Sequence, residues 1–161
     1  MTIRPAAPAD IAALLAIWNP IIRDTTITFS SDEKTAEGLA ALIAARRKAG
    51  RDFFVAEAAG VQGFASYDQF RGGNGYAHAM EHTVILGPGA RGRGFGRALI
   101  TAVEDHARAA GHHTMHAGVS GENRDGVAFH DRVGYRTCGI VPEAGYKFGR
   151  WLDLVLMQKR L

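Results

Sequence analysis

Residues 87–97 read Gly87-Pro88-Gly89-Ala90-Arg91-Gly92-Arg93-Gly94-Phe95-Gly96-Arg97. This stretch holds five of the chain's 20 glycines and three arginines, but no acidic residue. Glycine lets backbone N–H groups come close to a ligand, and the first N–H groups of a helix are free to bind an anion. Arginines at a helix N-terminus oppose the helix dipole by about 0.3–1 kcal/mol each, and a bound anion would reverse that cost. The stretch therefore predicts an anion site; the alternative is a glycine-rich turn with solvated arginines.

The sequence on either side places this stretch between a strand and a helix. Glu81 to Leu86 is expected to be a strand, and an amphipathic helix is expected to begin near Gly92 to Gly94 and to end at Gly111. A further strand at 114–119 completes a strand-helix-strand unit, which implies parallel pairing. The apolar face of the predicted helix consists of Phe95, Leu99, Ile100 and Val103.

The rest of the chain alternates in the same way. Strands are expected at Ile3-Arg4, at 53–57 and 61–67 as a hairpin, and at 151–157. Helices are expected from Pro8 to Asn19-Pro20, where proline ends or kinks the helix, and at 35–48 and 124–131. The pattern predicts one α/β (α+β) domain over residues 1–161, with a mixed central β-sheet flanked by helices.

Length and composition agree with this reading. The 161 residues suit one domain, and 47% hydrophobic with 22% charged residues argues against disorder or a coiled coil. A single cysteine cannot form an intrachain disulfide. No apolar run has the length of a membrane span and no secretory leader pattern is present, so we expect a cytoplasmic protein without a membrane partner. The net charge of +3 equals that of residues 87–97, so the high pI does not indicate a nucleic-acid surface.

Two common phosphate-binding motifs do not fit residues 87–97. The P-loop is excluded because no glycine there is followed by Lys and Ser/Thr at the required offsets. Gly87-x-Gly89-x-x-Gly92 matches the dinucleotide fingerprint formally, but residues 109–111 lack the expected acidic partner.

The segment Arg91-Gly92-Arg93-Gly94-Phe95-Gly96 resembles the cofactor-binding loop of the GCN5-related N-acetyltransferase (GNAT) superfamily. Of three further segments, one resembles the next motif of that superfamily and two resemble its phosphinothricin N-acetyltransferase-like subgroup, and all four segments have the same order along the chain. This sequence departs from the family pattern at Gly126, where relatives commonly have serine. The contact that the serine side chain would make to CoA is therefore missing or replaced by water. The matching segments are Glu81-His82-Thr83-Val84, Gly121-Glu122-Asn123 with 129–135, and 145–153.

The resemblance implies an acetyl-CoA-dependent N-acetyltransferase with direct transfer in a ternary complex. Acetyl transfer to an amine requires a base, donors for the oxyanion and an acid for the thiolate. Glu81 is the expected catalytic base, directly or through a water, and His130, where the wider family often has tyrosine, is either the acid or a hydrogen-bond partner of the cofactor. Asn123 either contacts the pantetheine arm or the substrate, or caps a helix, or does both. The expected cofactor-binding residues are Val84, Ile85, Leu86, Arg91, Gly92, Arg93, Gly94, Phe95, Gly96, Arg97 and Asn123.

The subgroup also implies the acceptor: the α-amine of a small amino acid or an analogue such as phosphinothricin, methionine sulfoximine or methionine sulfone. Its carboxylate requires a cationic partner, for which we predict Arg71, with Phe29, Asn74, Gly75 and Tyr76 as further substrate-binding residues. Residues 147–151 are expected either to complete this pocket or to form a dimer contact, and for their aromatic side chains packing in the core is the role expected first. The resemblance further implies a homodimer.

Two other functional classes remain as alternatives. His78-Ala79-Met80-Glu81-His82 spells H-x-x-E-H, a metallohydrolase motif when helical, but its surroundings predict a loop and a strand, and His112, His113 and His116 lack partners at ligand spacing. We therefore expect no metal. A basic nucleic-acid-binding module would require basic and aromatic residues interleaved along a face, which only 146–151 offers, so no nucleic-acid partner is expected. Cys138 is expected to be a buried, inert thiol.

Overall fold

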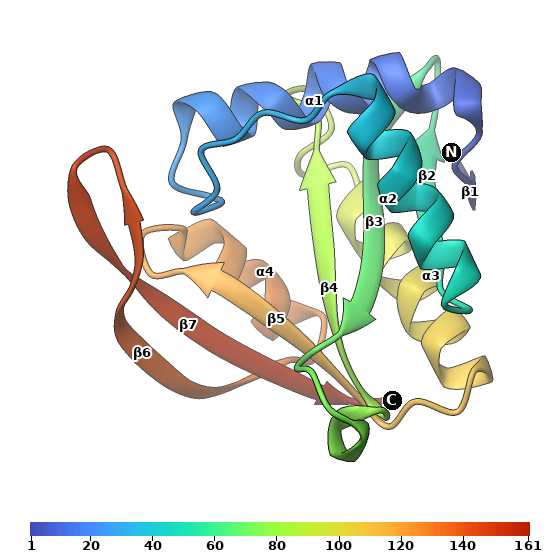
Figure 1. Cartoon of the computed structure of the whole chain (residues 1–161). Coiled ribbons are helices and arrows are strands. Elements are labelled where there is room, and N and C mark those ends of the chain that lie inside the picture. The colour runs from blue at the N-terminus through green and yellow to red at the C-terminus, as the bar shows by residue number, and fades with distance from the viewer.

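A computed structural model describes all residues 1–161. Its one seven-stranded sheet has the order β1-β2-β3-β4-β5-β7-β6 (Figure 1). Every neighbouring pair is antiparallel except β4 and β5, which are parallel. The strands are β1 (Thr2–Pro5), β2 (Phe53–Glu57), β3 (Val61–Gln69), β4 (Ala79–Leu86), β5 (Thr114–Ser120), β6 (Arg136–Lys147) and β7 (Arg150–Arg160). The helices are α1 (Ile11–Asp24), α2 (Ala36–Lys48), α3 (Phe95–Ala109) and α4 (Arg124–Arg132), with 3₁₀ turns at Pro8–Asp10 and Asn74–Tyr76.

The apolar periodicity explains how the helices lie on the sheet. In α3 the predicted face of Phe95, Leu99, Ile100 and Val103 is buried against strands of the first half of the sheet. On the other face, α1 and α2 cover β2 and β3 through Leu14, Leu39, Ile43, Phe53 and Phe64. Two apolar cores thus pack against opposite faces of β1–β4. This packing fixes the position of β4, whose free edge faces the functional site. No helix has the length and apolar character needed to cross a membrane.

The predicted α/β domain, its hairpin and its parallel pair are confirmed. The first helix was expected to end or kink near Pro20, but α1 continues to Asp24 with Pro20 inside it. Proline removes one N–H donor and disfavours the preceding residue's helical conformation, yet packing of α1 on the sheet keeps the helix continuous.

The sequence did not predict β6, because Gly139, Pro142 and Gly145 interrupt its apolar pattern. An edge strand tolerates such residues, and β6 shifts its register against β7 at two places, 137–139 and 141–145. Cys138 lies at the first shift. Cys138 is exposed, so the prediction of a buried thiol was wrong. The reason is that no helix packs over this part of the edge strand.

The turn between β6 and β7 also corrects an expectation. Phe148 and Gly149 both have positive φ, 53° and 74°, which is the geometry of a tight two-residue hairpin turn. The prediction that the aromatic residues here pack in the core was wrong, because Phe148 and Trp151 are 57% and 61% exposed. The hairpin extends beyond the helices that cover the rest of the sheet (Figure 1).

Candidate functional site

The site begins where β4 and β5 separate. The two parallel strands pair only at Ala79, Met80 and Glu81, which face 114–116. From His82 to Leu86, β4 remains paired with β3 but has no strand on its other side. Figure 1 shows the two strands diverging from this point. The backbone N–H and C=O groups along this free edge are available to bind an extended ligand, as predicted for Val84, Ile85 and Leu86.

Glu81 is the last residue of β4 that pairs with β5, so its side chain lies where the two strands diverge. Burial raises the pKa of its carboxyl group above the usual value. A Cβ atom added at Gly118 of β5 would lie 2.9 Å from Glu81 Oε1. The absence of a side chain at Gly118 therefore leaves the space in which the carboxylate lies, and the raised pKa makes this carboxylate a stronger base than an exposed glutamate.

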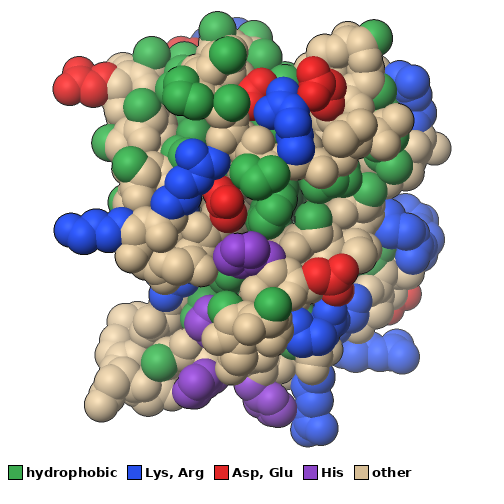
Figure 2. Space-filling model, turned by 90° about the vertical axis from the view of Figure 1, so that its right-hand side faces the viewer, with side chains coloured by type: hydrophobic (Ala, Val, Ile, Leu, Met, Phe, Trp, Pro, Cys, Tyr) green, Lys and Arg blue, Asp and Glu red, His purple; other side chains and the backbone are tan.

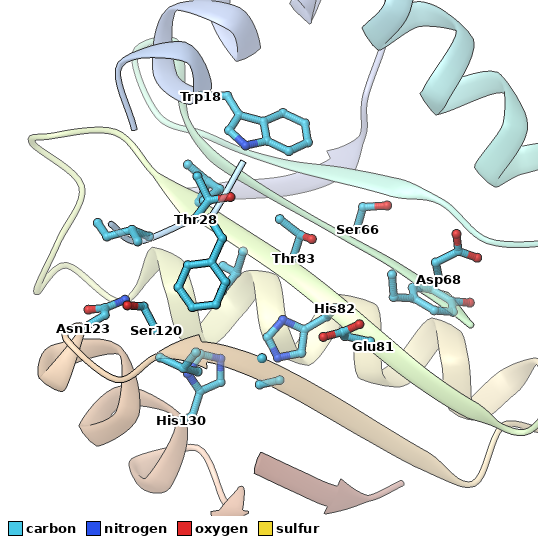
Figure 3. Close-up of a pocket in the computed structure, with 18 of the residues that line it drawn as sticks. Trp18, Thr28, Ser66, Asp68, Glu81, His82, Thr83, Ser120, Asn123 and His130 are labelled. Atoms are coloured by element: carbon cyan, nitrogen blue, oxygen red, sulfur yellow. The ribbon is translucent and has the colours of Figure 1, made fainter. Parts of the chain in front are cut away.

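A cavity of about 350 Å³ opens in front of Glu81; we call it the Glu81 cavity. Figure 3 shows Trp18 from α1 on one side, Glu81 and Thr83 from β4, and Asn123 and His130 on the opposite side. Phe29 lines it as predicted. The cavity is lined by Trp18, Ile27, Thr28, Phe29, Leu42, Arg46, Phe53, Ser66, Tyr67, Asp68, 81–85, 117–120, Asn123, His130 and Leu154.

A second cavity, of about 400 Å³, lies over the glycine-arginine stretch; we call it the arginine-loop cavity. Arg91 and Arg97 line it, and Gly94 precedes α3 with a φ of 85°, which lets the chain turn sharply into the helix. The first turn of α3 contains no acidic residue and receives no side-chain cap. Its free N–H groups and the two guanidinium groups fit a phosphorylated ligand. The other lining residues include Leu86, Gly92, Gly96, Asp125, Gly126, Phe129 and Arg132.

The two cavities share one wall. Five residues line both of them: Ile27, Val84, Ile85, Asn123 and His130. A ligand with phosphates in the arginine-loop cavity and an arm along the free edge of β4 would bring its end to this wall, with Glu81 on the far side. The arrangement suits transfer of a group from the first ligand to a second one in the Glu81 cavity.

His130 is buried in α4 at this shared wall. Its Nδ1 lies 2.7 Å from the Gly126 carbonyl oxygen, which can only accept, so Nδ1 carries the proton, while Nε2 has no partner. Burial lowers the pKa of His130, and the pKa of His82, whose ring stacks on it at 5.1 Å, is lowered strongly for the same reason. Both imidazoles are therefore neutral at neutral pH, and the unprotonated Nε2 of His130 is buried without a hydrogen-bond partner.

Asn123 has both of the roles considered for it in position. Its Oδ1 accepts a hydrogen bond from the Gly126 N–H at 3.0 Å, which caps α4, and its side chain lines both cavities. A Cβ at Gly126 would lie 2.7 Å from Asn123 Cγ. Glycine instead of serine at this position thus makes room for the asparagine side chain in its capping conformation.

Some predicted site residues lie outside the cavity walls. Arg93 donates to the Gly89 carbonyl at 3.3 Å and covers the ring of Phe95, which is buried in the core. Four predicted acceptor residues, Arg71, Asn74, Gly75 and Tyr76, are exposed in the loop between β3 and β4, where the Arg71 guanidinium lies over the Tyr76 ring. The chain by itself does not bring these four to the Glu81 cavity.

The structure adds site residues that the sequence did not indicate. Arg46 of α2 lines the Glu81 cavity and forms an ion pair with Asp68 of β3, which also accepts from Arg51 at 2.7 Å. Trp18 lines the cavity from α1. Their sequence pattern is that of ordinary amphipathic helices, so only the packing of α1 and α2 on the sheet reveals them.

The histidines do not assemble into a metal site. Figure 2 shows histidine side chains gathered on one face of the molecule, and the rings of His78 and His112 lie 6.4 Å apart. Nevertheless, no group of three His, Cys, Asp or Glu side chains is placed to hold a metal ion. The H-x-x-E-H segment is a loop and a strand, with His82 buried against His130 and Tyr135 and not facing His78.

Comparison with known proteins connects this geometry to a protein family. Residues 3–156 match the family described as "Acetyltransferase (GNAT) domain". The L-methionine sulfoximine/L-methionine sulfone acetyltransferase of Salmonella typhimurium is 36% identical over 100% of this chain and 95% of its own length. Two crystal structures share the fold closely. Ribosomal-protein-alanine N-acetyltransferase from Brucella melitensis has a TM-score of 0.96 at 37% identity and covers 100% of both chains. A phosphinothricin acetyltransferase from Sinorhizobium meliloti in complex with acetyl-CoA has a TM-score of 0.94 at 28% identity, covering 99% of this chain and 88% of that one.

Proposed function

The chain belongs to the GNAT family and is an acetyl-CoA-dependent N-acetyltransferase, and from this premise we propose that its acceptor is the α-amine of a small amino acid or analogue. The analogues in question are of the methionine sulfone, methionine sulfoximine and phosphinothricin type, which relatives of this chain are named for. The observation that carries the proposal is the shared wall between the two cavities. On one side of this wall lie Arg91, Arg97 and the start of α3, which suit a phosphorylated ligand, and on the other lies the half-buried carboxylate of Glu81.

The residues of the arginine-loop cavity fit acetyl-CoA. Arg91, Arg97 and the free N–H groups at the start of α3 would hold its phosphates, and the unpaired edge of Val84, Ile85 and Leu86 would bind the pantetheine arm. When bound, acetyl-CoA supplies the acetyl group as a thioester. Backbone N–H groups on the same edge would stabilise the negative charge that develops on the carbonyl oxygen.

Glu81 is the proposed general base. An acceptor amine is protonated at neutral pH and must lose a proton before it can attack the thioester. The raised pKa of Glu81 brings its carboxyl group closer to the working pH, and its location at the apex between β4 and β5 lets it act directly or through a water. Its task is to take this proton and hold it on the acceptor side of the shared wall.

For His130, the structure favours the second of the two expected roles, that of a hydrogen-bond partner of the cofactor. An acid would require a proton on Nε2 and hence an imidazolium, which burial disfavours. We propose that neutral His130 accepts a hydrogen bond at Nε2, the cofactor contact that was the other expectation for it. A histidine that accepts at the shared wall would orient an amide N–H of the pantetheine arm, and the departing thiolate would take its proton from the ammonium that forms on the acceptor nitrogen after attack.

Direct transfer in a ternary complex is the proposed sequence of events. The only cysteine, Cys138, is exposed on β6 and lines neither cavity, so it is not placed to carry the acetyl group. Both ligands can instead occupy their cavities together and meet at the shared wall, which avoids a covalent intermediate.

Arg71 stays the proposed partner of the acceptor carboxylate. Asp68 lines the Glu81 cavity, and Arg71 follows three residues later, so its loop starts at the rim of the cavity. Arg71→Ala should raise the KM for the acceptor far more than the KM for acetyl-CoA. Equal effects on both constants would move the carboxylate site elsewhere, with Arg46 as the other cation at the wall.

The proposal is tested by a thiol-release screen. Purified protein and acetyl-CoA are combined with amino acids, with their sulfone, sulfoximine and phosphinate analogues, and with a short peptide that begins with alanine. We expect the highest kcat/KM for a free amino acid or analogue. Faster reaction with the peptide would overturn the proposed acceptor class, and no thiol release with any amine would overturn the proposed reaction.

A homodimer and a cytoplasmic location are proposed with this function. The end of β6 and β7 exposes Ile140, Tyr146, Phe148 and Trp151, a set of apolar side chains that a second copy could cover. Acetyl-CoA is a cytoplasmic metabolite, which supports the location. Sedimentation of the purified chain, compared with a Trp151→Glu variant, tests the dimer: both species sedimenting as monomers would reject it.

A further inference from the structure

Lys147 near the end of β6 is a buried cation without a carboxylate partner. Its side chain is 2% exposed, and its Nζ donates to the carbonyl oxygens of Ile22 at 2.5 Å and Thr28 at 2.8 Å. A buried charge is costly unless it is hydrogen-bonded. Ile22 lies in the last turn of α1, where the free carbonyls carry partial negative charge, so the ammonium is stabilised there. One side chain of β6 therefore joins the end of α1 to the loop that follows it.

Gly145, two residues earlier, receives the aromatic side chain of that loop. A Cβ atom at Gly145 would lie 2.5 Å from Cγ and 2.7 Å from Cε2 of Phe29, so the ring rests directly on the strand backbone. Residues i and i+2 of a strand share a face. Gly145 and Lys147 thus form one surface, which we call the β6 seat.

A third tie attaches the same loop to the neighbouring hairpin strand. Thr26 Oγ1 donates to Glu122 Oε2 at 2.9 Å, and Arg150 Nη2 donates to that same oxygen at 2.9 Å. These groups are exposed to solvent, so this contact contributes less to holding the loop in place than the buried ammonium of Lys147 does.

The loop needs such attachments because its own backbone does not fix it. No backbone-to-backbone hydrogen bond joins residues 26–34 to one another or to the rest of the chain, and they form no helix or strand. Yet Thr28 and Phe29 form a wall of the Glu81 cavity but not of the arginine-loop cavity. The position of this wall therefore depends on what holds the loop from outside.

We propose that Lys147 and Gly145 are positioning residues for the acceptor: the β6 seat holds Phe29 and Thr28 in place as the wall of the Glu81 cavity. Neither seat residue lines the Glu81 cavity or the arginine-loop cavity, so both would act through the loop. The inference rests on the proposed function, because it assigns the acceptor to the Glu81 cavity. Loosening the seat should weaken acceptor binding more than cofactor binding, because Thr28 and Phe29 line only the Glu81 cavity, while Ile27 of the same loop lines both cavities.

Two variants test the seat, each with a matched control. Lys147→Met keeps most of the side-chain length and removes the ammonium, and Lys48→Met removes an exposed charge at the end of α2. Gly145→Ala pushes the Phe29 ring off the strand, and Gly139→Ala adds the same methyl group to the same strand where nothing lies within 4 Å. We expect both seat variants to raise the acceptor KM at least tenfold with the KM for acetyl-CoA changed less than threefold, and both controls to match the parent protein.

A second measurement does not depend on catalysis. Limited digestion with chymotrypsin, followed by mass spectrometry, reports how often the backbone after Phe29 is accessible. Cleavage at Phe29 should be several-fold faster in both seat variants and unchanged in the controls. Unchanged cleavage and an unchanged acceptor KM would overturn the proposal, as would equal increases in both KM values with cleavage throughout the chain. If the parent protein acetylates no amine, the proposed function fails, while cleavage at Phe29 still shows whether the seat holds the loop.

Discussion

Replacement of Gly118 by alanine tests whether the position of Glu81 limits the reaction. The added methyl carbon would lie 2.9 Å from Glu81 Oε1 and 3.4 Å from Leu154 Cδ1. Ordinary contact begins at 3.4 Å, so the carboxylate must move by about 0.5 Å. The end of a glutamate side chain can make this movement with little strain, and the fold should keep its stability.

The cost should instead be catalytic. A misplacement of about 1 Å in a reacting group can cost on the order of 100-fold. Half that distance suggests a loss of roughly tenfold in kcat, with little change in the KM for acetyl-CoA. The methyl group also removes water from the carboxylate, which raises the pKa of Glu81 further, so the acidic limb of the pH–rate profile should move to higher pH.

The assay is thiol release with saturating acetyl-CoA, measured from pH 5 to 9 for the parent protein, Gly118→Ala and Gly139→Ala. If Gly118 acts through Glu81, adding Gly118→Ala to Glu81→Gln should change kcat no further. The reasoning is refuted if Gly118→Ala keeps the parent kcat and pH profile, or if the two substitutions multiply.

Three other substitutions test further parts of the site. Glu81→Gln should lower kcat by about 100-fold or more, the range of general base catalysis. Because burial raises the pKa of Glu81 in the folded state, its contribution to stability is present below the unfolded pKa and is lost as the pH rises through the folded pKa. The glutamine variant should therefore melt at a higher temperature than the parent protein at pH 8 but not at pH 4, and the opposite order would contradict the burial argument. Arg97→Gln should raise the KM for acetyl-CoA about tenfold, while Arg136→Gln, which changes an exposed arginine of β6, should not; calorimetric titration with CoA provides the check. Asn123→Ala should lower the free energy of unfolding by about 1 kcal/mol in urea, since it removes the cap on the Gly126 N–H. A variant with the parent's stability would show that the cap adds nothing.

Local chemistry made much of the arginine-loop cavity predictable. Residues 81–111 contain all of its local features: a strand, glycines that adopt positive φ, and a helix whose first turn has no acidic residue. The amphipathic face of α3 was likewise identified, because a period of 3.6 residues needs no distant partner. Glu81 was identified as the candidate base, but its raised pKa results from burial by residues that are distant in the sequence.

The Glu81 cavity could not be predicted in the same way. Its wall combines Trp18, Phe29 and Arg46 with β4 and β5, and Phe29 is held by a strand more than 100 residues away. For the same reason the sequence could not show where Arg71 lies relative to the cavity, or that the aromatic residues at 146–151 are exposed. Both depend on which helices and strands cover which edge of the sheet.

The sequence by itself thus predicted the four helices, every strand except β6, their order along the chain, and residues 87–97 as a candidate anion site, because backbone conformation, periodicity and helix ends are set by neighbours along the chain. Only the tertiary structure decided that β4 and β5 part directly after Glu81, that Gly118 leaves room for its carboxylate, and that two cavities meet at a wall of five residues. The physical reason is that strand pairing and cavity walls arise from contacts between segments far apart in the chain, for which the sequence carries no local pattern.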